Sequence, residues 1–136
     1  MTALTAERNT PERIGATRGY PLAASTTVYQ GSLGVLDAGY LKPGRTATAL
    51  VAVGRIERTA SAVAAGDEVV QVRPGVFPWA NSASADLIEQ DDVGKLAYIV
   101  DDQTVALTSA TDTRSVAGRI VAVDDAGVWI DTRPNA

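Results

Sequence analysis

The sequence predicts an all-β protein: a single small β-sandwich or β-barrel domain of about eight short strands, with one short helical turn. From Gly94 to Asp131, apolar residues recur at every second position between groups of turn residues, which is the pattern of strands with one buried face. The 136 residues are 46% apolar but include only one Phe and two Trp. Much of the apolar content is Ala and Val, and β-branched Val favours pleated sheet over helix.

A chain of this length fits one domain. Residues 1–25 are polar and broken by Pro and Gly, so they predict an extended N-terminal arm that becomes ordered on a neighbouring subunit; a flexible terminus is the alternative interpretation. Residues 26–132 are predicted to form the β domain and residues 133–136 a tail. No internal repeat is apparent. The residues predicted to make the arm's contacts are Arg13, Arg18 and Tyr20.

The first half of the β domain offers several short strands separated by Gly and Pro. The longest apolar run, 47–58, predicts a buried strand, and Gly54 inside it predicts a β-bulge. The other segments expected to form strands in this half are 26–30, 33–37, 68–72 and 76–79.

The region 81–93 is predicted to hold the helical turn. Asn81 or Ser82 could cap it, Leu87 and Ile88 give it an apolar side, and Gly94 would end it.

Two successive hairpins are predicted in the second half. In the first, Leu96 and Tyr98 fall on one face and Ala97 and Ile99 on the other, before a turn at 101–103. The second hairpin turns at 124–127, where Gly127 is free to adopt a positive φ. Together the hairpins form the centre of the predicted domain.

Composition argues against most catalytic chemistry. The chain contains no His and no Cys, which removes the commonest general base, the thiolate nucleophile and the commonest transition-metal ligands. No phosphate-binding loop and no nucleophile-elbow motif is present. The net charge of −4 and the scattered arginines argue against nucleic acid as a partner. The prediction is a protein that is not an enzyme and needs no cofactor.

Three pairs of adjacent acids are candidates for a cation site or for paired catalytic carboxylates. They lie at 91–92, 101–102 and 124–125. Two of the three fall at predicted hairpin tips, where Asp commonly accepts hydrogen bonds from backbone N–H groups. Turn chemistry is therefore the favoured interpretation, and no metal site is predicted.

The few large aromatic residues are interpreted as anchors of the core or of a subunit contact. They are Phe77, Trp79 and Trp129. No stretch is long and apolar enough to predict a membrane span, and the N-terminus does not have the pattern of a signal peptide.

The segments 91–106, 113–121 and 127–130 together resemble a family of small structural proteins of tailed bacteriophages and Mu-like prophages. These are the capsid cement proteins, also described as decoration or head-stabilisation proteins. Gly66-Asp67, Gly75-Val76-Phe77 and residues 80–83 fit the same family in the same order. The resemblance spans about residues 28–131 and leaves the arm uncovered.

This resemblance implies a non-enzymatic virion protein that is assembled in the cytoplasm of the bacterial host. It implies binding to the outer capsid surface at junctions between major capsid protein subunits, where the protein stabilises the shell. The implied partners are the major capsid protein and further copies of the chain, as a homodimer or homotrimer. The alternative is a carbohydrate- or receptor-binding β-sandwich module of a phage or cell-surface fibre, for which Trp79 beside Asn81 is the available aromatic–amide pair.

Overall fold

The computed structural model describes residues 2–10 and 15–133 of the chain. This portion of the protein is nearly all β, which confirms the predicted fold class, and it contains twelve strands rather than about eight. The strands are β1 (Arg18–Pro21), β2 (Thr26–Val28), β3 (Leu33–Asp37), β4 (Tyr40–Pro43), β5 (Val51–Ile56), β6 (Ala60–Ala62), β7 (Val69–Arg73), β8 (Val76–Trp79), β9 (Leu96–Ile99), β10 (Val105–Ala106), β11 (Val116–Asp124) and β12 (Gly127–Asp131).

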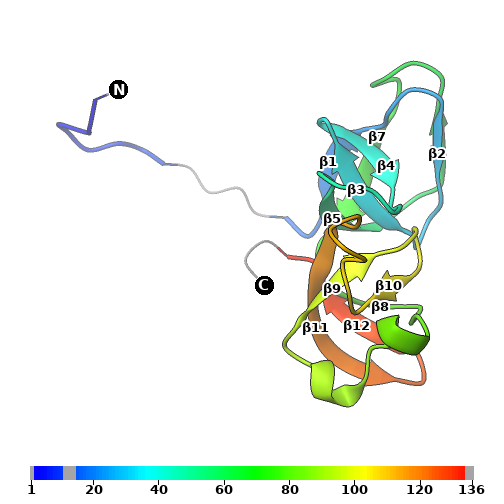
Figure 1. The fold of residues 1–136 in the computed structure, drawn as a ribbon. Helices are drawn as coiled ribbons and strands as arrows, with labels where there is room; N and C mark the ends of the chain where they lie inside the picture. Colours follow the sequence, from blue (N-terminus) through cyan, green and yellow to red (C-terminus); the bar gives the residue numbers. More distant parts are fainter. Residues whose placement is uncertain (1, 11–14, 134–136) are drawn as a thin grey trace.

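Two five-stranded antiparallel sheets dominate the molecule, in the orders β1-β7-β5-β3-β4 and β10-β9-β11-β12-β8. A parallel bridge closes each sheet, between Leu22 and Leu41 in the first and between Ala80 and Thr104 in the second. Each sheet is therefore a small closed barrel, named barrel 1 and barrel 2 below, and closure removes exposed strand edges. In Figure 1 barrel 1 lies above barrel 2, and the ribbon of β2 and β6 stands beside barrel 1.

The two barrels have the same topology. We number the five strands of each barrel in chain order. The sheet of barrel 2, read from β10 to β8, then has the order 3-2-4-5-1, and the sheet of barrel 1, read from β4 to β1, has the same order. No internal repeat is apparent in the sequence, but the fold contains one. The two units are contiguous in sequence, because β7 ends at Arg73 and β8 begins at Val76.

The correspondence extends to individual hydrogen bonds. In both units a glycine N–H before the second strand donates to an isoleucine carbonyl in the fourth, and the amide of that isoleucine donates back to the residue after the glycine. The bonds are Gly31 N to Ile56 O at 2.8 Å and Ile56 N to Ser32 O at 2.9 Å in barrel 1, and Gly94 N to Ile120 O at 2.9 Å and Ile120 N to Lys95 O at 2.9 Å in barrel 2.

A β-bulge lies at the same place in both barrels. The pairing of β3 with β5 shifts register at Gly34, which faces Gly54, and the pairing of β9 with β11 shifts just before Gly118. The bulge predicted at Gly54 is thus confirmed. Gly54 has φ of +132° and Gly118 has φ of +157°, and a Cβ on either would overlap the carbonyl oxygen of the neighbouring strand.

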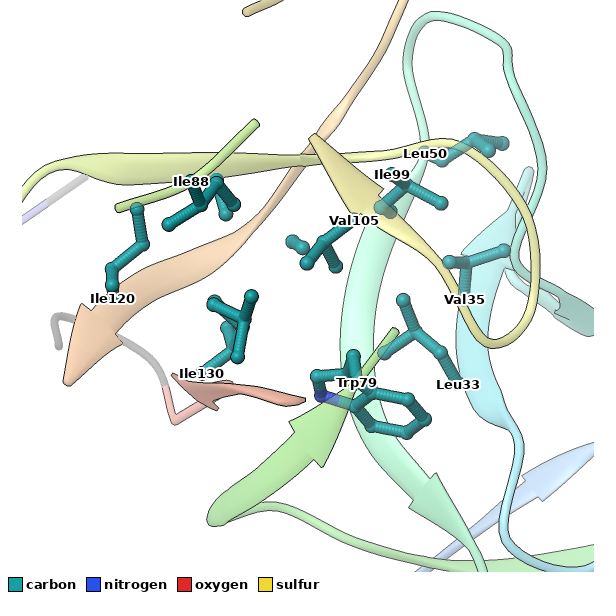
Figure 2. Packing of buried hydrophobic residues seen from close by; sticks show 12 residues of the cluster. Leu33, Val35, Leu50, Trp79, Ile88, Ile99, Val105, Ile120 and Ile130 are labelled. Atoms are coloured by element: carbon teal, nitrogen blue, oxygen red, sulfur yellow. The ribbon is translucent and has the colours of Figure 1, made fainter. Parts of the chain in front are cut away.

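Each barrel has its own hydrophobic cluster. Corresponding positions fill the two interiors: Ile56 and Val72 are fully buried in barrel 1, and Ile120 and Ile130 are 1% and 0% exposed in barrel 2. The cluster of barrel 2 also includes Leu33, Val35 and Leu50 from the first half of the chain. Figure 2 shows Leu33 beside Trp79, and Val35 near Ile99 and Leu50. The barrels therefore share a packed contact.

Ser115 connects the two barrels through polar contacts as well. Its Oγ accepts from Leu50 N at 3.0 Å and donates to Ala47 O at 2.8 Å. The β9–β10 turn adds two more bonds, in which Leu33 N donates to Asp102 O at 2.8 Å and Thr46 Oγ1 donates to Val100 O at 2.8 Å.

The hairpin predictions are confirmed. β9 pairs with β10 and β11 with β12, Ala97 and Ile99 are buried while Leu96 is exposed, and Gly127 has φ of +129°. The predicted helical turn is two 3₁₀ turns, η1 (Ser84–Asp86) and η2 (Gln90–Asp92). The predicted caps are wrong, because Ala83 and Glu89 rather than Asn81 or Ser82 are the N-caps of η1 and η2, and the segment connects β8 to β9.

The predicted boundary of the arm at residue 25 is wrong. Arg18–Pro21 pairs with β7, and Leu22 is fully buried in barrel 1. Gly19 allows this close pairing, since a Cβ there would come within 2.8 Å of the Gln71 side chain. Residues 2–10 are all exposed and extend away from the barrels (Figure 1). Of the predicted tail, residues 134–136 lie outside the described residues.

Candidate functional site

A basic cleft lies where the N-terminal segment joins barrel 1. Its volume is about 380 Å³, and its lining includes Gly15, Arg18, Arg73, Pro74 and Arg133. Three cationic side chains from different regions of the sequence thus meet at the root of the arm. Such a cleft can bind carboxylates or other anions on a partner.

Two of these arginines already have acidic neighbours. Arg133 Nη2 lies 2.7 Å from Asp131 Oδ2, and Arg73 Nε lies 3.9 Å from Glu57 Oε1. Arg133 holds the pKa of Asp131 below its usual value, mainly by a side-chain hydrogen bond. Within residues 2–10 and 15–133, Arg18 has no ion pair, so it is the arginine of this cleft that can pair with an incoming anion without breaking an existing bridge.

An apolar groove adjoins the cleft. Its volume is about 340 Å³, and it runs across the seam between the barrels. Val51 is 59% exposed, Val116 40% and Leu96 37%. Arg133 lines both the groove and the cleft, so the two recesses are neighbours on either side of this residue.

The predicted arm contacts have different positions. Arg13 lies outside the described residues. Arg18 is exposed in β1 and lines the basic cleft. Tyr20 is half-buried and packs against the cluster of barrel 1, so its ring mainly contributes to the packing of that barrel.

The three predicted anchors also differ. Trp79 is 4% exposed, within the cluster of barrel 2, and its Nε1 has no hydrogen-bond partner among the residues that the structure describes. Phe77 is half-buried, with the guanidinium of Arg55 4.3 Å from its ring centroid. That cation–π contact links barrel 1 to barrel 2. Trp129 is half-buried, and its Nε1 donates to Asp124 Oδ2 at 2.9 Å.

At both predicted hairpin tips, an acidic side chain accepts a hydrogen bond from a backbone N–H group. Asp101 Oδ1 accepts from Gln103 N at 2.9 Å, and Asp124 Oδ1 accepts from Ala126 N at 2.8 Å. These contacts support turn chemistry as the role of both tips. Among the described residues, no group of three or more acidic side chains is arranged to hold a metal ion.

Asp92 is the most enclosed acid of the three pairs. Its Oδ2 accepts from Glu89 N at 2.8 Å, and its Oδ1 pairs with Lys95 Nζ at 3.0 Å. The backbone N–H of Glu89 first, and Lys95 second, lower the pKa of Asp92 from its usual value. Asp92 therefore caps η2 and fixes the approach to β9.

The aromatic–amide pair of the fibre hypothesis is not available at the surface. Trp79 is buried, and the Asn81 side chain is committed to its own loop: Nδ2 donates to Ile88 O at 2.8 Å and Oδ1 accepts from Ile88 N at 3.0 Å.

Sequence reasoning identified Arg18 but missed Arg73, Arg133 and the groove. The alternation placed Leu96 on the opposite face from Ala97 and Ile99, but it did not indicate which of the two faces points outward. The arginines carried no signal either, because the pairing of β1 with β7 brings Arg18 near Arg73, and Arg133 reaches them from the end of β12.

The comparisons with known proteins add no relative. A scan against protein-family models found no match, and searches of curated proteins and of solved structures found none either. Across the residues that the structure describes, no helix has the length and apolar character needed to cross a bilayer.

Proposed function

We propose that this chain is a non-enzymatic virion structural protein that binds the outer capsid surface at junctions between major capsid protein subunits and stabilises the shell. The observation that carries the proposal is the N-terminal segment. Residues 2–10 are entirely exposed and extend from a compact body whose basic cleft lies at the segment's root. The resemblance of segments 91–106, 113–121 and 127–130 to capsid cement proteins supports the same role.

The physical argument is bivalency. A cement protein must contact two neighbouring subunits, and two weak contacts on one shell act at high effective concentration. The basic cleft provides one contact and the N-terminal segment provides the other. Ordering the segment costs free energy, which added backbone pairing and apolar burial on the shell can offset.

The test is cosedimentation of the purified protein with expanded empty shells of the phage that encodes it, at low and at high salt. Saturable binding with a stoichiometry set by shell symmetry is the expected result. Deleting residues 2–14 should abolish binding and leave the barrels folded, because β1 begins at Arg18. Deletion through residue 23 should instead unfold barrel 1, since it removes β1 and buried Leu22.

Two single substitutions test the cleft. Arg18→Ala should weaken shell binding and reduce its salt dependence. Arg58→Ala is the matched control, because Arg58 is 46% exposed at its side chain and pairs with Glu68, away from the cleft.

Full binding by the variant lacking residues 2–14 would refute the role of the segment. Absence of wild-type binding at either salt concentration would refute the capsid role.

A further inference from the structure

The outer face of β3 and β5 is buried inside the molecule. Leu33 and Val35 point away from the interior of barrel 1 and are fully buried in the cluster of barrel 2. Ala52 packs against the same cluster. One barrel's outer face is thus covered by the other barrel.

The corresponding face of barrel 2 is exposed. The pairing registers place Leu96, Tyr98 and Val116 at the positions that Leu33, Val35 and Ala52 occupy in barrel 1. Leu96 is 37% exposed, Val116 is 40% exposed and Tyr98 is half-buried. Leu96 and Val116 line the apolar groove. The repeated face, defined by these three residues in barrel 2, has therefore no second barrel over it.

One part of the surface that covers the face in barrel 1, the β9–β10 turn, also has an exposed counterpart. Barrel 2 contacts barrel 1 through its β9–β10 turn, where Asp102 O accepts from Leu33 N. The equivalent turn in barrel 1 joins β3 to β4. Ala38 and Gly39 in that turn lie at the surface, and Tyr40 presents an aromatic ring that is 41% exposed.

We propose that a second copy of this chain docks its β3–β4 turn onto the exposed β9–β11 face, as barrel 2 docks on barrel 1 within one chain. Each copy carries one exposed face and one exposed turn. The contact is therefore head-to-tail, and repetition closes a ring or extends a filament. This self-association does not depend on what the assembled protein binds, so a failure of shell binding leaves it intact.

The first test is the mass in solution, by light scattering during size-exclusion chromatography at about 100 μM, a concentration at which a contact with a micromolar Kd is mostly formed. The wild-type protein is expected at two or more times the monomer mass of 14.1 kDa. Leu96→Asp and Tyr40→Asp should each run as a monomer with an unchanged thermal melt. Val63→Asp is the matched control, since Val63 is 83% exposed and lies on neither surface; it should keep the wild-type mass.

Mixing the two interface variants gives the decisive result. Leu96→Asp retains an intact turn and Tyr40→Asp retains an intact face, so a head-to-tail contact predicts that the mixture forms dimers and nothing larger. Monomers in the mixture would overturn the proposal, because they would indicate a patch that pairs with itself. A monomeric wild-type protein, or an oligomer that both variants preserve, would overturn it equally.

Discussion

Substituting Gly54 with alanine tests the bulge that both barrels share. Gly54 has φ of +132°, a conformation that L-residues rarely adopt. An added Cβ would overlap Arg73 O and lie 2.7 Å from Arg73 C and 2.9 Å from Pro74 Cα. All three atoms are backbone, so no side chain can rotate away. Either β5 and β7 separate at the point where barrel 1 leads into barrel 2, or the strain remains.

The expected loss combines two effects. An unfavourable φ for a residue with a Cβ costs about 1–3 kcal/mol, and overpacking against fixed neighbours costs about 1–3 kcal/mol more. Gly54→Ala should therefore lower the free energy of unfolding by about 2–6 kcal/mol, a large fraction of the roughly 5–15 kcal/mol that holds a domain folded. The melting temperature should fall by about 10 °C or more.

The assay is urea unfolding followed by circular dichroism with linear extrapolation. Gly66→Ala is the matched control: Gly66 has φ of +83°, and a Cβ added there would have no atom within 4 Å, so this variant carries only the backbone strain of about 1–2 kcal/mol. Gly118→Ala should behave like Gly54→Ala, because its Cβ would overlap Asp131 O. Equal losses for Gly54→Ala and Gly66→Ala would refute the steric argument.

Two further predictions concern polar contacts. Ser115→Ala should lower the free energy of unfolding in urea by about 1–3 kcal/mol, because it leaves a buried amide and a carbonyl of barrel 1 without their partner. The control Ser61→Ala, at an exposed position, should change that free energy by no more than about 0.5 kcal/mol. Similar losses for the two variants would contradict the role of Ser115 in connecting the barrels. Asp92 has a pKa lowered by the Glu89 N–H and by Lys95, so its contribution to stability is present above the unfolded-state pKa and is lost as pH falls through the folded-state value. The stability difference between wild type and Asp92→Asn should therefore be largest near neutral pH and shrink below about pH 4, and a difference that is constant over this range would argue against the assignment.

Local patterns predicted local structure well. The alternation from Leu96 to Ile99 correctly separated the two faces of β9, and Gly54 in an apolar run correctly predicted a bulge. Both features depend on residues within a few positions of each other. The first strand was missed because its four residues contain Gly and Pro, and its stability comes from pairing with β7, far away in the sequence.

The internal repeat was missed for a related reason. The two barrels share their hydrogen-bonding pattern, but little of their sequence has to be the same to keep it. Gly54-Arg55-Ile56 corresponds to Gly118-Arg119-Ile120. The glycine of each triplet is required because the backbone of the neighbouring strand leaves no room for a side chain. Elsewhere any apolar residue of suitable size can fill the interior, so Val72 and Ile130 occupy equivalent positions without identity. The groove and the cleft likewise depend on how the barrels meet, which no single segment encodes.

The antiparallel pairing of β1 with β7 determines how the molecule responds to mechanical tension. Arg18, at the start of β1, lies opposite Val72, near the end of β7, and β7 leads within a few residues into barrel 2. A pull between the N-terminal segment and barrel 2 therefore loads this strand pair at one end, as a zipper is loaded. The residue pairs between β1 and β7 would separate one after another, from Arg18 toward Pro21, and Leu22 would leave the interior of barrel 1 last. The attachment of the segment thus yields gradually under load, while barrel 2 stays closed.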